Sequence, residues 1–246
     1  MIASDFDTLS RQAAEFVSEY LIKLAKIKNR ISIVLAGGKT PRGLYEHLAT
    51  HDVQMRIPWR KIHLFWGDER WVSSQHKESN YRLVYEALIS KIPIPPGNVH
   101  PLVTETTDLQ KAADAYERKL HEFFGSARSK WPRFDLVILG VGIDGHTASL
   151  FQGQAVLKEK KRWVVAIYVE KVRAYRLTLT LPVFNHAAQV VFVAAGREKA
   201  VVLKEGIGTR HSRARFPYQL IKPHRGRTIF FLEMTAASLM GQSKET

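Results

Sequence analysis

Hydrophobic residues along this chain follow two patterns: short runs rich in Val, Ile, Leu and Phe, and runs spaced as on one face of a helix. The short runs predict strands, most of them buried on both faces as in a parallel sheet. These predicted strands are 31–36, 62–66, 134–141, 163–169, 175–181, 189–195 and 228–233. The helically spaced runs predict helices at 5–28, 41–48, 79–91, 108–124, 197–204 and 236–240. Strands alternate with helices, so we expect an α/β fold: a doubly wound, mostly parallel, Rossmann-like sheet flanked by helices.

Side-chain chemistry at the predicted boundaries refines this pattern. Ser4 is the expected N-cap of the first helix. Thr40 is the expected N-cap of the second, with Pro41 as its first helical residue. In the strand at 175–181, Leu alternates with Arg and Thr, so we expect Leu to point inward and Arg and Thr outward.

Length and composition indicate a globular protein rather than a membrane-spanning or disulfide-rich one. The chain has 246 residues, of which 45% are hydrophobic and 24% charged, and we expect one domain over 1–246. No apolar run approaches the ~20 residues of a membrane-spanning helix, and residues 1–7 lack the pattern of a secretory signal. There is no cysteine, which fits a reducing compartment, so we expect a cytoplasmic location.

The chain is strongly basic, with a formal net charge of +14. Such a charge favours anionic ligands, whether phosphorylated metabolites, nucleic acid or an acidic membrane surface. Part of the excess lies in the segment 204–227, which is either a solvated basic loop or a polyanion-binding patch. Its only aromatic residues are Phe216 and Tyr218, which gives weak support for base stacking. We expect neither a membrane partner nor a specific nucleic-acid partner. We expect the protein to be a monomer or a weak homodimer.

Two glycine-containing turns carry the candidate chemistry. The first follows the strand at 134–141 and places a carboxylate, Asp144, and an imidazole, His146, at the strand's carboxyl end, where open α/β sheets bind ligands. The second, Gly37-Gly38-Lys39-Thr40, joins a strand to a helix and predicts an anion site, to which Lys39 adds a charge. It matches neither the P-loop nor the dinucleotide-binding pattern.

Further charged residues follow other strands. Arg70 in Asp68-Glu69-Arg70 could clamp a phosphate or carboxylate, although mutual pairing of these three residues is slightly favoured. Arg176 and Lys199 are either further ligand-binding cations or ordinary surface residues. No metal-type cluster such as His-Glu-x-x-His and no Gly-x-Ser-x-Gly turn occurs, so we predict no catalytic metal, no cofactor and no serine-hydrolase mechanism.

Six motifs, in this order, resemble those of 6-phosphogluconolactonases of the type related in fold to glucosamine-6-phosphate isomerase/deaminase. They are Gly37–Pro41, Asp68–Val72, Ser79–Arg82, Gly142–Phe151, Arg176–Pro182 and Gly196–Ala200. The resemblance implies a cytosolic, metal-independent enzyme that hydrolyses 6-phospho-D-glucono-1,5-lactone in the oxidative pentose phosphate pathway. It also implies roles for the residues: His146 as general base, Asp144 as its orienting partner and Arg70 as a catalytic cation. The implied substrate-binding residues are Gly37, Gly38, Lys39, Thr40, Asp68, Arg176 and Lys199.

Two departures from the family pattern and two competing functions accompany this resemblance. Lys39 stands where the family usually has Ser, and Pro217-Tyr218-Gln219 stands where it commonly has Pro-Ala-Ser. The closest competing function is glucosamine-6-phosphate isomerisation and deamination, whose enzymes usually continue Asp-Gly-His with Ile-Ala-Phe-Asn-Glu. This chain instead reads Thr-Ala-Ser-Leu-Phe after His146. The other is polyanion binding by the segment 204–227.

Overall fold

The computed structural model describes residues 1–106, 108–125, 131–207 and 215–240. Within them, seven strands form one sheet in which every pairing is parallel. Their spatial order is β1 (Ile2–Ala3), β10 (Arg227–Glu233), β9 (Gln189–Ala194), β6 (Leu136–Gly140), β2 (Ile31–Leu35), β3 (Ile62–Trp66) and β5 (Val99–His100). The predicted α/β fold with a mostly parallel, doubly wound sheet is confirmed.

The order of the strands reverses in the middle of this sheet. From β2 the chain builds outward through β3 to β5, and from β6 it builds in the other direction through β9 to β10. The two starting strands, β2 and β6, are hydrogen-bonded neighbours. Loops that leave the carboxyl ends of two such strands diverge to opposite sides and open a crevice between them. The two glycine-containing turns, about 100 residues apart in sequence, therefore lie side by side.

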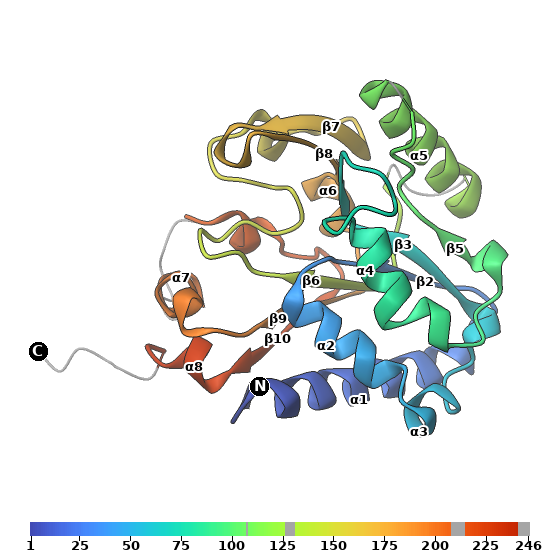
Figure 1. Cartoon of the computed structure of the whole chain (residues 1–246), viewed down its shortest axis with the longest axis vertical. Helices are drawn as coiled ribbons and strands as arrows, with labels where there is room; N and C mark the ends of the chain where they lie inside the picture. The colour runs from blue at the N-terminus through green and yellow to red at the C-terminus, as the bar shows by residue number, and fades with distance from the viewer. Residues whose placement is uncertain (107, 126–130, 208–214, 241–246) are drawn as a thin grey trace, which may run out of the picture.

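Helices cover both faces of the sheet (Figure 1). On one side lie α1 (Phe6–Ala25) and α2 (Lys39–Leu48), and on the other lies α5 (Leu109–Phe124). The remaining helices are α3 (His51–Gln54), α4 (Asn80–Ala87), α6 (Leu181–Phe184), α7 (Ala200–Ile207) and α8 (Met234–Ala237). Helix α1 buries a stripe of residues spaced by four, which removes apolar surface from water: Leu9, Ala13, Val17 and Leu21.

Both predicted N-caps are shifted by one or two residues in the structure. Asp5, not Ser4, caps α1: its carboxylate accepts the Thr8 N–H at 2.8 Å, while the Ser4 hydroxyl bonds to Asp5 itself. Helix α2 begins at Lys39 after Gly38, whose φ of 102° is the left-handed region that glycine adopts without strain. Pro41 is thus the third helical residue. N–H groups in the first turn have no acceptor within the helix, so a proline at this position breaks no helical hydrogen bond.

A second, three-stranded antiparallel sheet was not predicted as a separate unit. It consists of β4 (Asp68–Arg70), β8 (Ala174–Leu179) and β7 (Val164–Val169), with β8 in the centre. The expectation that Thr side chains of β8 point outward is wrong, since Thr178 is fully buried. Its hydroxyl donates to the Leu179 carbonyl at 3.0 Å, which satisfies the buried polar group.

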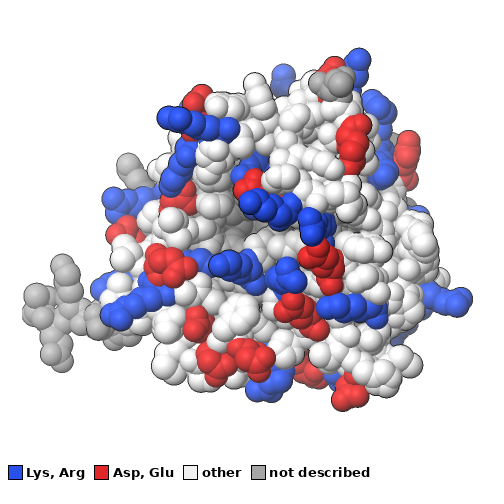
Figure 2. Space-filling view, in the orientation of Figure 1, with Lys and Arg blue, Asp and Glu red and all other residues white. Residues whose placement is uncertain are grey.

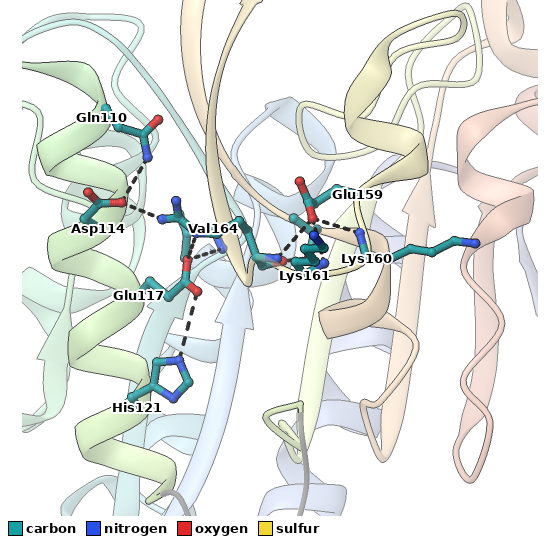
Figure 3. A network of polar contacts seen from close by, with 10 residues as sticks. Gln110, Asp114, Glu117, His121, Glu159, Lys160, Lys161 and Val164 are labelled. Carbon is teal, nitrogen blue, oxygen red and sulfur yellow. Dashed lines mark hydrogen bonds and ion pairs between the residues drawn. The ribbon is translucent and has the colours of Figure 1, made fainter.

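Arg162, in the loop before β7, bonds the second sheet to helix α5. Figure 3 labels the acidic residues of this contact, Asp114, Glu117 and Glu159. The Arg162 guanidinium donates to the carboxylate of Glu117 at 2.7 Å and to that of Asp114 at 2.5 Å. Glu117 also accepts the Val164 N–H, and Glu159 accepts three consecutive N–H groups of the loop before β7. Charge-assisted bonds of this kind fix both distance and orientation, so the second sheet has a defined position over the main sheet.

Candidate active site

A cavity of about 790 Å³ lies at the carboxyl ends of β2, β3, β6 and β9. All the predicted site residues line it except Asp144 and Arg176, each of which neighbours a lining residue: Asp144 bonds to His146, and Arg176 is the cross-strand partner of Arg70. The lining members are Gly37, Gly38, Lys39, Thr40, Asp68, Arg70, His146 and Lys199. Figure 2 shows a hollow near the middle of this face, bordered by Lys and Arg side chains. The cavity thus combines one imidazole with several cations, as an anionic substrate requires.

His146 is held in a fixed position on the cavity wall. Its Nδ1 lies 2.5 Å from Oδ1 of Asp144, and its ring stacks on Phe151 with centroids 4.2 Å apart. A Cβ at Gly142 would lie 2.1 Å from the same Nδ1, so only glycine at this position leaves room for the ring. Because Asp144 occupies Nδ1, the other ring nitrogen is the one available to a substrate or a water molecule.

The carboxylate of Asp144 has a second partner, the ammonium of Lys171, which bonds to Oδ2. Burial would raise the pKa of Asp144, but the hydrogen bonds from Lys171 and His146 outweigh it and lower the pKa to about 2. Asp144 is therefore ionised at neutral pH. An ionised carboxylate keeps the proton of the neutral imidazole on Nδ1, which leaves the opposite nitrogen as an acceptor.

The loop after β2 is shaped by a buried tyrosine. The Tyr45 hydroxyl donates to the Ala36 carbonyl and accepts the Ala36 N–H, both at 2.9 Å, and so holds the last residue before Gly37. Helix α2 then begins at Lys39, which lines the cavity, and it has no acidic residue in its first turn. The amino end of the helix and the Lys39 ammonium together give this corner of the cavity a positive potential.

Three further cations stand around the cavity. Arg70 on β4 lines it and lies directly across from Arg176 on β8 in the strand register. Burial, and after it the charge of Arg70, lowers the pKa of Arg176. Burial also lowers the pKa of Lys199, while the charges of Glu198 and Glu233 act in the opposite direction. Like charges placed this close favour a bound anion that compensates them.

The side chains of Asp68, Glu69 and Arg70 form no ion pair with one another, contrary to the favoured expectation, and the bond within the segment runs from the Arg70 backbone N–H to the Glu69 carboxylate. Asp68 accepts hydrogen bonds from the Ser149 hydroxyl at 2.7 Å and from Asn80 at 3.1 Å, and Arg70 donates to the Glu78 carbonyl. Asp68 thereby joins the loop that carries His146 to the start of α4. Glu69 is buried and accepts the N–H groups of Arg70, Asn80 and Tyr81 and the Ser79 hydroxyl.

Sequence reasoning missed two residues of this site. Lys171 lies in the turn between β7 and β8, and no motif marks it. Asn80 belongs to a quoted motif, but its contact with Asp68 was not foreseen. Of the basic segment 204–227, Arg210, His211 and Arg213 lie outside the described residues, and Arg215 is paired with Glu205 at 2.8 Å. Phe216 packs where a Cβ of Gly145 would lie, so this segment reaches the turn that holds His146.

The described residues contain neither a cluster of metal ligands nor a helix suited to a membrane. No group of three or more His, Asp or Glu side chains in 1–106, 108–125, 131–207 and 215–240 is placed to hold a metal ion. In the same part of the chain, no helix combines the length and the apolar character needed to cross a membrane.

The fold and the site define a class: α/β proteins with a cation-lined cavity at the switch point of a parallel sheet. Residues 4–230 match the model of the glucosamine-6-phosphate isomerases/6-phosphogluconolactonase family, so the chain belongs to that family. It is 38% identical over 228 residues to a 6-phosphogluconolactonase of Synechocystis, covering 93% of this chain and 92% of that protein.

Solved structures agree with this family assignment. The 6-phosphogluconolactonase of Thermotoga maritima superposes with a TM-score of 0.81 at 32% identity, covering 95% of this chain and 98% of that one. That of Trypanosoma cruzi superposes with a TM-score of 0.86 at 30% identity, covering 98% and 96%. The predicted resemblance to 6-phosphogluconolactonases is thus confirmed.

Proposed function

We propose that this protein hydrolyses 6-phospho-D-glucono-1,5-lactone to 6-phosphogluconate in the oxidative pentose phosphate pathway. The observation that carries the proposal is the position of His146, bonded to Asp144, on the wall of a cavity that Lys39, Arg70 and Lys199 also line. An activated ester needs one base and one anion-stabilising group, and a phosphorylated substrate needs a cationic cradle. The names of the relatives, 6-phosphogluconolactonase in each case, support the same substrate.

The reaction requires a proton to move twice through the imidazole. The free ring nitrogen of His146 takes a proton from water as the water oxygen attacks the lactone carbonyl carbon. Negative charge develops on the carbonyl oxygen, where the guanidinium of Arg70 stabilises it. The intermediate then collapses: the bond to the ring oxygen breaks, and the imidazolium returns its proton to that leaving oxygen. The products are a carboxylic acid, which ionises, and a free hydroxyl.

Binding energy comes from the phosphate, at the other end of the substrate. The Gly37–Thr40 loop, the amino end of α2 and the Lys39 ammonium hold it, and Lys199 faces the same cavity. Arg176, the cross-strand neighbour of Arg70, adds a second positive charge beside it. Asp68 fixes the His146 loop through Ser149. Remote binding of this kind orients the reacting carbonyl against the base.

The test of this function is a comparison of freshly prepared 6-phosphogluconolactone with unphosphorylated gluconolactone. Because charge-assisted bonds to the phosphate are lost in the second substrate, we expect its kcat/KM to be lower by at least about 10²-fold. Lys39→Ala brings the kcat/KM values of the two lactones closer together. The control is Lys26→Ala, at the C-terminal end of α1, which leaves both values unchanged. Equal rates on both lactones contradict the phosphate cradle, and ammonia release from glucosamine 6-phosphate would assign the deaminase reaction instead.

The proposed role of His146 as general base also predicts how kcat/KM depends on pH. Only the neutral imidazole accepts a proton from water, so kcat/KM falls on the acid side as His146 becomes protonated. Asp144 does not contribute to this limb, because its pKa of about 2 keeps it ionised throughout. The measurement is kcat/KM over the whole acid range in which the protein stays folded, with the spontaneous hydrolysis of the lactone subtracted. A rate that stays flat to the acid end would remove His146 from the role of base.

A further inference from the structure

The turn between β7 and β8 brings a lysine to the back of the Asp144–His146 pair. Lys171 lies in a 3-10 turn over Glu170–Val172, which Arg173 closes in the left-handed conformation with φ 47°. From there its ammonium reaches Oδ2 of Asp144, 27 residues away in sequence. The Lys171 side chain is 59% exposed and that of Asp144 25% exposed, so the contact lies at the surface, outside the cavity lining.

The two oxygens of Asp144 have different partners. Oδ1 accepts from the His146 side, through Nδ1 at 2.5 Å and the backbone N–H at 3.2 Å. Oδ2 accepts from Lys171. A carboxylate bonded at one oxygen can rotate about its bond to Cβ, whereas one bonded at both oxygens to different elements is fixed. The imidazole, which depends on Oδ1 for its orientation, is fixed with it.

We propose that Lys171 is a positioning residue for the reaction: it locks the Asp144 carboxylate against His146 and thereby sets the orientation and proton affinity of the base. The inference rests on the proposed lactonase function for its kinetic consequence. It also gives the second sheet a role, because the hairpin that Arg162 anchors to α5 at one end carries Lys171 at the other.

The direction of the effect on proton affinity follows from the charges around the imidazole. Asp144 favours the imidazolium, and the Lys171 ammonium offsets part of that negative charge. The other charges of the cavity are those of Lys39, Arg42, Glu46, Asp68, Arg70, Glu198, Lys199 and Glu233, and the turn itself adds Glu170 and Arg173. Only Lys171 bonds to the far oxygen of Asp144 among these groups in the described chain. Removing it therefore leaves the carboxylate charge uncompensated, and the imidazole holds its proton to higher pH.

The experiment compares Lys171→Met and Lys171→Arg with the wild type and with Lys161→Met as a control. Lys161 is an exposed lysine on the loop that leads into β7, where only its backbone N–H bonds to Glu159. In Lys171→Met we expect kcat to fall about 10-fold with KM nearly unchanged, and the acid limb to move up by about 0.5 to 1 pH unit. Lys171→Arg keeps a hydrogen-bond donor and a positive charge, so we expect its kcat and its acid limb to be those of the wild type. We expect the same values for Lys161→Met.

A second readout does not depend on turnover. In protein labelled at its histidines with ¹⁵N, the His146 signals are identified by their loss in His146→Asn, and their titration is followed without substrate. The proposal expects the midpoint to move to higher pH in Lys171→Met and to stay in place in Lys171→Arg. An unchanged titration midpoint in Lys171→Met overturns the proposal. A raised KM at unchanged kcat also overturns it, because Lys171 would then be a substrate-binding cation. A shifted midpoint in a protein that turns over no lactone supports the positioning role and rejects the lactonase function.

Discussion

His146→Asn lowers kcat for lactone hydrolysis by at least about 10²-fold, the contribution expected of a positioned general base. The asparagine amide is close in size to the imidazole and can still donate to Asp144, so the loop keeps its shape. What it lacks is a nitrogen that accepts a proton from water. The side chain is 32% exposed, and its removal leaves no large cavity, so the midpoint of thermal unfolding stays close to that of the wild type.

The control for this substitution is His51→Asn, which changes an 84% exposed histidine on α3. We expect it to leave kcat and KM unchanged. The two variants together separate the loss of a base from the loss of a histidine anywhere on the protein. Turnover by His146→Asn within a few-fold of the wild type would mean that the water is activated by another group, and the Asp144–His146 pair would then have a structural role.

The parts of the site that could be predicted from the sequence are those that follow a buried parallel strand. Gly37–Thr40 follows β2 and Gly142–His146 follows β6; β6 is a continuous apolar run that ends in glycine, and β2 is apolar apart from Ser32. Parallel strands direct all their carboxyl ends to one edge of the sheet, so the position of each turn follows from the strand before it. Lys199 follows β9 by the same logic and lines the same cavity.

The second sheet could not be predicted in the same way. Strand β4 is three residues long and consists of Asp68, Glu69 and Arg70, none of which favours a strand. It becomes a strand only because it pairs with β8, more than 100 residues later in the chain. That pairing places Arg176 beside Arg70, and no local sequence pattern indicates that the two residues are neighbours.

The contact between Lys171 and Asp144 had no signal in the sequence for a related reason. An exposed lysine in a hairpin turn is among the commonest surface features of proteins. Whether Lys171 reaches Asp144 depends on where the second sheet lies over the main sheet. The bonds of Arg162 to Glu117 and Asp114 help to fix that position. Local sequence determines each segment, and packing between segments determines which side chains meet.

Gly142→Ala lowers kcat by about 10²-fold, because a misplacement of about 1 Å in a catalytic group has this effect on the rate. A Cβ at this position would lie 2.1 Å from Nδ1 and 2.2 Å from Cε1 of the His146 ring, so the ring must move. It cannot do so without weakening its 2.5 Å bond to Asp144 or its stacking on Phe151. Gly142 is not among the residues with positive φ, so alanine strains the imidazole rather than the local backbone.

The matched control is Gly97→Ala, since a Cβ there meets nothing within 4 Å and its φ is also not positive. We expect it to leave kcat unchanged, while both variants keep the overall fold by circular dichroism. The ¹⁵N signals of His146 should differ from the wild type in Gly142→Ala alone, which ties the kinetic loss to the ring. Wild-type turnover by Gly142→Ala would show that the rate tolerates a displaced imidazole. The close approach of ring and backbone would then have no part in catalysis.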